Sequence, residues 1–270
     1  MSALGAVPLV SCLMITRDRL ALAKRAIRCF TDQSYPRLEL IVVSAGDRAY
    51  RRAVAHHLEH QGVGNARIIA AEPGSSLGAL RNVSLDAATG DIVCQWDDDD
   101  CYHPDRVLYQ VEQMVRQGAR ACFLTDNLQL LEPDRQLFWI NWTRYAGKDE
   151  QGEQWRRLFP PTMMTVKDNR FRYPEVGPFA QAGEDLSFAA DLCREVPVVM
   201  VQGMGWLYLY VFHGENTFSR EHYYLIAAQR SFPNEWIQTR SEEIRRAMRY
   251  YSTPTPLVVC GAYGPAFNLP

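Results

Sequence analysis

The chain has 270 residues, of which 47% are hydrophobic and 22% charged, as in an ordinary globular protein with a full core. The formal net charge of -2 provides no overall positive field that would favour nucleic acid as a partner. The seven cysteines are scattered and odd in number, which argues against a disulfide framework and favours a reducing cytoplasm.

The apolar N-terminal stretch imitates an export signal. Residues 9–12 read Leu-Val-Ser-Cys, like a lipoprotein cleavage site, but no Lys or Arg precedes the apolar run. Elsewhere nothing approaches the ~20 consecutive apolar residues of a membrane-spanning helix. We therefore expect a cytoplasmic protein without a transmembrane segment. A homo-oligomer is compatible with this composition.

The first half of the chain alternates predicted strands with predicted helices. Strands are predicted at 9–15, 38–43, 66–71 and 92–94, and helices at 20–30, 48–61, 78–89 and 104–117. This alternation predicts an α/β fold with a Rossmann-type, mostly parallel, doubly wound sheet. The loops at 16–19, 44–47 and 97–101 should then face one shared crevice.

The second half is less regular. Strands are predicted at 121–124, 136–141, 162–166, 196–201 and 206–212, helices at 184–193, 220–230 and 241–250, and a loop at 142–159. We expect a single domain over residues 1–251. Residues 252–270 contain four prolines and are predicted to form a C-terminal arm or a partly ordered tail.

Four consecutive carboxylates, Asp97 to Asp100, directly follow the short apolar strand at 92–94. Alternation along a strand would place Asp97 and Asp99 on one face and the other two on the opposite face. Adjacent carboxylates resist full ionisation, and a hard divalent cation removes that penalty. A solvated acidic turn is the alternative, but open α/β sheets place ligands at the ends of buried strands.

With these motifs the chain resembles the inverting glycosyltransferases of family two, which have a GT-A fold. The resemblance covers roughly residues 8–222 and rests on motifs that occur in the family's order. They lie at 10–19, 33–36, 79–82, 88–91, 96–100, 183–185 and 213–217. It implies transfer of a hexosyl or N-acetylhexosaminyl group from a nucleoside-diphosphate sugar, with Mn or Mg as cofactor. The acceptor would be a saccharide, a lipid-linked glycan or a protein.

The resemblance also implies roles within the acidic run. Asp97 would lie nearest the nucleoside, with Asp98 also on the donor side. Asp99 would bind the metal, with Asp100 beside it. His213 ends an apolar strand, where it either contacts the metal or the diphosphate, or is a core histidine satisfied by the backbone.

Four further residues are expected on the donor side. Thr16 and Arg19 belong to the loop after the first strand. Arg81 either pairs with the diphosphate or lies on a helix surface. Ser44 ends the second strand, where family members usually carry acidic residues that help to recognise the nucleobase. The identity of the donor's nucleobase therefore stays open. The Ser44 hydroxyl can still form hydrogen bonds.

Sugar transfer also needs a base that removes the proton of the acceptor hydroxyl. The resemblance places this base at Asp185, and Glu184 beside it is the second candidate. The alternative is that both carboxylates merely complement the N-terminus of a helix.

Other residues carry less information. His56 and His60 have helical spacing, but a solvated helix face explains them better than a metal site. Trp139, Trp142 and Trp155 either stack on sugar rings or belong to the core.

Two other functions stay open: a non-catalytic nucleotide-sugar-binding module, and a nucleotidyltransferase. The latter would need a glycine-rich phosphate loop at 16–19, which reads Thr-Arg-Asp-Arg.

Overall fold

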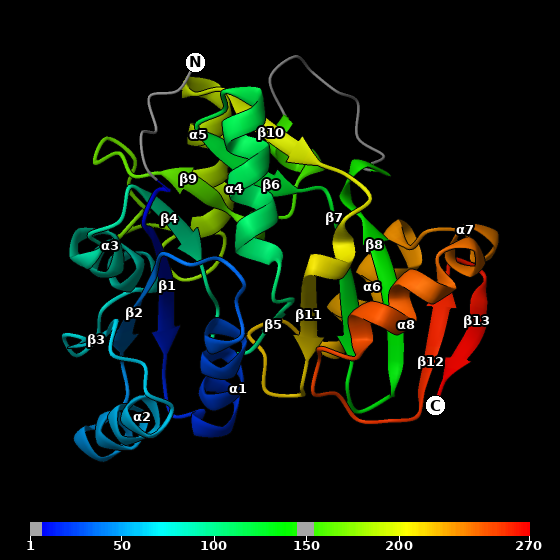
Figure 1. Cartoon of the computed structure of the whole chain (residues 1–270), viewed down its shortest axis with the longest axis horizontal. Coiled ribbons are helices and arrows are strands. Elements are labelled where there is room, and N and C mark those ends of the chain that lie inside the picture. Colours follow the sequence, from blue (N-terminus) through cyan, green and yellow to red (C-terminus); the bar gives the residue numbers. More distant parts are fainter. Residues whose placement is uncertain (1–6, 145–153) are drawn as a thin grey trace.

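The computed structural model of the protein describes residues 7–144 and 154–270. The first six residues and the middle of the predicted 142–159 loop therefore lie outside the described residues. Figure 1 shows two β-sheets side by side, one built mainly from the N-terminal half of the chain and one from the C-terminal half.

The first sheet has seven strands in the order β10-β6-β9-β4-β1-β2-β3. Their bounds are β1 Val10–Thr16, β2 Leu38–Ser44, β3 Ala66–Ala70, β4 Ile92–Gln95, β6 Ala121–Leu124, β9 Met164–Val166 and β10 Val198–Val201. All run parallel except β9, which is antiparallel to both β4 and β6. This confirms the predicted mostly parallel sheet.

Helices cover both faces of this sheet. They are α1 Leu20–Thr31, α2 Arg48–His60, α3 Leu77–Ala87, α4 Arg106–Gln117 and α5 Glu184–Glu195. Alternation along β1 divides the core: Cys12 packs in the cluster that contains α1, α2 and α4 residues, whereas Leu13 packs with α3 and α5. The fold is therefore doubly wound, and its strand ends are left free to form a site.

The second sheet has six strands in the order β13-β12-β8-β7-β11-β5. Their bounds are β5 Cys101–Tyr102, β7 Asp126–Leu131, β8 Gln136–Asn141, β11 Tyr208–Phe212, β12 Leu257–Gly261 and β13 Gly264–Leu269. Helix α6 (Arg220–Arg230) packs on one face, and α7 (Asn234–Thr239) and α8 (Ser241–Met248) pack on the other. Short 3-10 helices lie at Trp142–Arg144, Gln154–Arg157, Pro160–Thr162 and Gly205–Leu207.

The sequence did not predict this second sheet as a unit. Strand β7 is buried along its whole length although it contains Asp126, Asn127 and Gln129, so it lacks the continuous apolar run that marks a fully buried strand in the sequence. Its neighbour β11 is distant in sequence and pairs with it in parallel. The irregular half is thus ordered by long-range pairing.

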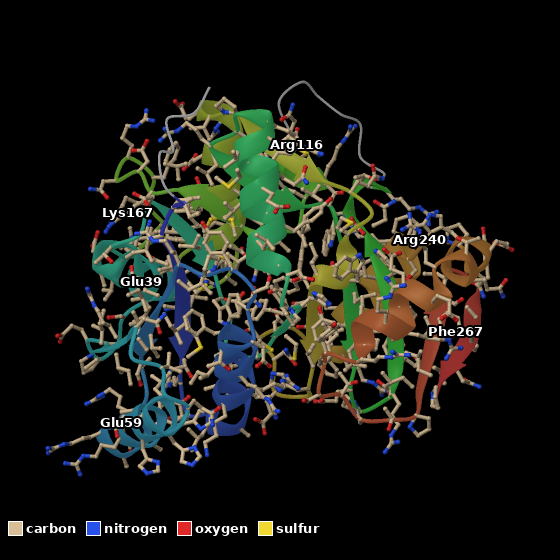
Figure 2. The ribbon with its side chains drawn as sticks, viewed as in Figure 1. Glu39, Glu59, Arg116, Lys167, Arg240 and Phe267 are labelled. Carbon is tan, nitrogen blue, oxygen red and sulfur yellow. The ribbon has the colours of Figure 1, made fainter. Side chains whose placement is uncertain are left out.

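The C-terminal stretch predicted as an arm or tail forms the hairpin of β12 and β13. Strand β12 extends the second sheet by pairing with β8, and Leu257, Val259 and Leu269 are buried. In Figure 2, Glu59 of α2 and Phe267 of β13 mark opposite ends of the molecule. Within residues 7–144 and 154–270, no helix is both long and apolar enough to cross a bilayer.

Candidate active site

The strand ends of the first sheet and the start of α5 surround a cleft of about 1160 Å³. This is where an open parallel sheet is expected to bind ligands. Most of the predicted site residues line it: Thr16, Arg19, Arg81, Asp97, Asp98, Asp99, Asp100, Glu184 and Asp185. One cleft therefore collects residues from β1, α3, the acidic run and α5.

Ser44 is a predicted donor-side residue that does not line the cleft. Its side chain is fully buried at the end of β2, and the next two residues, Ala45 and Gly46, form the cleft wall instead. Thr16, at the matching position of β1, is also buried, and its hydroxyl is hydrogen-bonded to the Tyr50 hydroxyl. The wall beside β2 thus begins with the small residues Ala45 and Gly46 and continues with Asp47 and Arg51.

The acidic run forms a turn after β4, yet its side chains alternate in exposure. The side chains of Asp97 and Asp99 are each 19% exposed, whereas those of Asp98 and Asp100 are buried at 1%. Asp97 and Asp99 are therefore the two carboxylates that a ligand in the cleft can reach most readily. This agrees with the division predicted from alternation.

Asp97 is fixed by two donors. The Gln95 side-chain amide donates to its Oδ2 at 2.9 Å, and Arg81 Nη2 donates to its Oδ1 at 3.0 Å. Arg81 Nε also donates to Glu184 Oε1 at 2.8 Å. The Arg81 side chain is 9% exposed, so its predicted alternative position on a helix surface is wrong.

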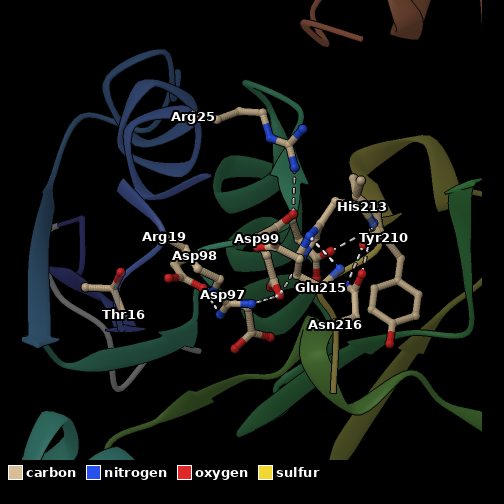
Figure 3. Close-up of polar contacts among 12 residues, drawn as sticks. Thr16, Arg19, Arg25, Asp97, Asp98, Asp99, Tyr210, His213, Glu215 and Asn216 are labelled. Carbon is tan, nitrogen blue, oxygen red and sulfur yellow. Dashed lines mark hydrogen bonds and ion pairs between the residues drawn. The ribbon is translucent and has the colours of Figure 1, made fainter. Parts of the chain in front are cut away.

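Asp98 and Asp99 share one cation. Arg19, which immediately precedes α1, donates from Nη1 to Asp99 Oδ2 at 2.7 Å and from Nη2 to Asp98 (Figure 3). Burial and the Asp99 charge raise the pKa of Asp98 to about 7. Burial also favours a raised pKa for Asp99, but His213 and Arg19 outweigh it and hold that pKa below its ordinary value.

Asp100 borders the cleft, but its carboxylate is bound by the second sheet. The Tyr208 hydroxyl donates to its Oδ2 at 2.5 Å, and the Val211 N–H donates to its Oδ1 at 2.9 Å. Burial, followed by the charges of Asp99 and Asp97, raises the pKa of Asp100 well above its ordinary value. Because both oxygens are engaged by β11, this geometry favours a structural role over the predicted position beside a metal.

His213 follows β11 and faces the acidic run (Figure 3). Its Nε2 lies 3.5 Å from Asp99 Oδ2, and the ring is 6% exposed. The Glu215 N–H donates to the ring Nδ1 at 3.3 Å, and the backbone N–H of His213 donates to Asn216 Oδ1 at 2.9 Å. Among the residues that the structure describes, Nε2 has no hydrogen-bond partner.

Asp99 and His213 could supply part of the ligands of a divalent metal, with a substrate completing the site. The described part of the chain contains no cluster of three or more His, Cys, Asp or Glu side chains suited to hold an ion. However, Mg²⁺ is commonly bound by one or two carboxylates together with substrate phosphates and water. The carboxylate of Asp99 matches that pattern, and Nε2 of His213, 3.5 Å from Asp99 Oδ2, would add one nitrogen donor beside it.

Asp185 lies in the first turn of α5 on the other side of Arg81. Burial and the adjacent Glu184 raise the pKa of Asp185 to about 7, which suits a general base at neutral pH. Its Oδ1 also accepts a hydrogen bond from the Leu186 N–H at 2.8 Å. The carboxylate thus complements the helix N-terminus while it lines the cleft.

The residues given less weight behave as their ordinary interpretations predict. His56 and His60 are exposed on α2. Trp139 is buried and donates to Asp126, Trp142 stacks on Phe159 with ring centroids 4.9 Å apart, and neither they nor Trp155 lines the cleft.

Sequence reasoning missed three residues that shape the acidic run. Arg25 donates to the Asp99 carbonyl at 2.8 Å, Tyr208 anchors Asp100, and Asn216 holds the backbone of His213. The position of Asn216 inside the 213–217 motif could have revealed it. Tyr208 carried no signal, because it lies in an apolar strand far from its partner in sequence.

A doubly wound sheet with an acidic run at its carboxyl edge, joined to a second mixed sheet, is the architecture of the GT-A glycosyltransferases. The family model described as "Glycosyl transferase family 2" matches residues 11–173, more than half of the chain. The chain belongs to this family. A search of curated proteins finds no match.

Solved structures support the same fold. S. aureus TarS 1-349 is 14% identical with a TM-score of 0.57, and the match covers 88% of this chain and 74% of that one. A complex of the same protein with UDP-GlcNAc matches over 91% and 68% of the two chains. The mannosyltransferase PcManGT from Pyrobaculum calidifontis, in complex with GDP-Man and Mn2+, is 16% identical with a TM-score of 0.55, over 92% and 66%.

Proposed function

We propose that this protein is a metal-dependent, inverting glycosyltransferase that moves a sugar from a nucleoside-diphosphate sugar to an acceptor hydroxyl. The observation that carries the proposal is that a single cleft contains both the Asp97–Asp99 part of the acidic run and Asp185. Structures of similar fold hold UDP-GlcNAc in TarS and GDP-Man with Mn2+ in PcManGT. They support a hexosyl or N-acetylhexosaminyl donor and a divalent metal such as Mn; Mg is the other metal that we propose.

On the donor side, Asp97 contacts the nucleoside part, and Asp99 with His213 holds the metal. When bound, the metal neutralises the charge that develops on the leaving diphosphate. Arg19 lies beside Asp99 and supplies a further cation for that charge. Thr16 and Ala45 form the cleft wall beside β2, where the nucleobase of the donor is recognised.

On the acceptor side, Asp185 accepts the proton of the acceptor hydroxyl. The hydroxyl oxygen bonds to the anomeric carbon as the bond from that carbon to the diphosphate breaks, so the configuration inverts. Glu184 is the poorer base, because it is 3% exposed and its Oε1 accepts from Arg81 at 2.8 Å. Asp185 has a pKa of about 7, so a large fraction is ionised at neutral pH.

The test is Asp185→Asn, which keeps the shape of the side chain but cannot take a proton. Release of UDP or GDP from a panel of sugar nucleotides is measured with Mn²⁺ and a panel of saccharide, lipid-linked and peptide acceptors. Loss of a general base should lower turnover by about 10²–10⁴-fold. Donor affinity, measured by calorimetry, should change less than about twofold, because the base acts only in the transition state.

Asp191→Asn is the matched control. Asp191 lies on the same helix, and its side chain is 41% exposed and paired with Arg194. This control should keep wild-type turnover. If Asp185→Asn keeps near-normal transfer, the base assignment is wrong; if it loses donor binding instead, the Glu184–Asp185 pair is structural.

A further inference from the structure

Arg81 is a buried cation that joins two carboxylates from distant parts of the chain. It donates from Nη2 to Asp97 and from Nε to Glu184, at 3.0 and 2.8 Å. The planar guanidinium makes this double contact possible, because its donors point in fixed, diverging directions. The ammonium group of a lysine could not reproduce it.

The backbone around Glu184 is attached to α3 without Arg81. Asn82 accepts from the Tyr173 N–H and donates to the Tyr173 carbonyl, both at 2.9 Å. The Gly78 N–H donates to the Ala180 carbonyl at 3.0 Å, and a Cβ on Gly78 would overlap the Pro174 carbonyl. Because these contacts already hold the 173–180 segment, Arg81 acts on the carboxylates themselves.

Among the described residues, Arg81 is the cation with the largest effect on the charge state of Asp185. In the described part of the chain, the charged and titratable groups that act most strongly on Asp185 are Glu184, Arg81 and Asp97, and the Tyr173 hydroxyl is also close enough to interact with it. Glu184 and Asp97 disfavour the ionised form of Asp185, whereas Arg81 favours it. Without Arg81, three carboxylates would lie together with no counter-charge among these groups.

We propose that Arg81 is a positioning residue that locks the start of α5 onto the acidic run and keeps Asp185 ionised, so that donor site and base form one unit. This inference rests on the proposed function. In this proposal Arg81 does more than line the cleft: by holding Glu184, it also positions the general base Asp185.

The test is the pH dependence of turnover at saturating donor. In the wild type, turnover should rise with pH through about 7, because Asp185 must lose its proton to act. Arg81→Gln should move this rise upward by about one pH unit. At pH 7 turnover should then fall about fivefold, and it should recover near pH 9, which damage to the fold would not allow.

Two further variants separate charge from geometry. Arg81→Lys keeps the charge, so its pH profile should stay within about 0.3 units while turnover falls at every pH. Glu184→Gln removes one negative charge beside Asp185, so its profile should move downward, opposite to that of Arg81→Gln. Glu184→Gln also carries the test if Arg81→Gln does not fold.

Arg172→Gln is the matched control. Arg172 pairs with Asp86 through Nη1 and Nη2 of its guanidinium group, and this pair also joins α3 to the segment before α5. It is solvent-exposed and does not line the cleft. Its removal should leave the pH profile unchanged.

The inference is overturned if Arg81→Gln loses donor affinity while its pH profile stays in place, or if Arg172→Gln moves the profile as far. An unmoved or upward-shifted profile in Glu184→Gln contradicts it as well.

Failure of the proposed function would look different. In that case the wild type would show no Mn²⁺-dependent release of nucleoside diphosphate, and Asp185→Asn would change nothing.

Discussion

The two sheets hold the same acidic run by different chemistry. From the side of the first sheet, Arg19 and Arg81 supply charged partners to Asp97, Asp98 and Asp99. From the second sheet, β11 supplies only a hydroxyl and an N–H to Asp100. His213 and Arg19 hold the pKa of the more exposed Asp99 below its ordinary value, whereas burial raises the pKa of Asp98 to about 7 even beside Arg19 and raises that of Asp100 well above its ordinary value. Residues of one type in one motif therefore differ in role because their neighbours differ.

The largest effect on ligand binding is expected from Asp99→Asn, which removes a carboxylate that has a charged partner, Arg19. It should weaken Mn²⁺-dependent binding of a nucleoside diphosphate by at least about tenfold, or ~1.4 kcal/mol. The melting temperature should fall by only a few degrees, because the lost interactions of Asp99 with Arg19 and His213 are partly offset by relief of repulsion within the acidic run. Calorimetry and a thermal melt measure both.

Asp105→Asn is the control for Asp99→Asn. The Asp105 side chain is 50% exposed shortly after the run and does not line the cleft. It should bind nucleotide as the wild type does. Unchanged affinity in Asp99→Asn would remove that residue from the metal site.

An intermediate effect is expected from His213→Ala. The unpartnered Nε2 contributes to binding rather than to folding, so Mn²⁺-dependent affinity should fall about three- to tenfold. The melting temperature should drop by less than about 3 °C. A drop of several degrees with normal affinity would instead identify a core histidine.

The smallest effect on binding is expected from Tyr208→Phe, which breaks the neutral side. Loss of the hydroxyl leaves Asp100 Oδ2 without this donor in a buried site and should cost about 1–3 kcal/mol of unfolding free energy. Nucleotide affinity should stay within about twofold. Urea unfolding and calorimetry measure these two quantities. If Asp100 contacted the ligand directly, Tyr208→Phe would instead weaken nucleotide binding strongly.

The first sheet could be predicted from the sequence because its strands are apolar runs separated by amphipathic helices. The second sheet could not, because its strands pair across long stretches of chain and β7 buries polar side chains. The same limit applies to the C-terminal hairpin, whose order depends on β8.

The candidate site was predicted in outline for a related reason. Asp97, Asp99 and Asp185 follow or begin regular elements, so their positions at one edge of a sheet could be inferred. The sequence could not show that Arg81 pairs with Glu184 or that Tyr208 anchors Asp100. Those contacts depend on which loops the fold brings together.

The central claim is tested most directly by titrating UDP and GDP into the wild-type protein, with Mn²⁺ and again with a chelator. The account predicts that at least one of the two binds with Mn²⁺ and that its affinity falls at least about tenfold in the chelator, because Asp99 and His213 need the diphosphate to complete a metal site. Binding of neither nucleotide, or equal binding with and without Mn²⁺, would contradict it.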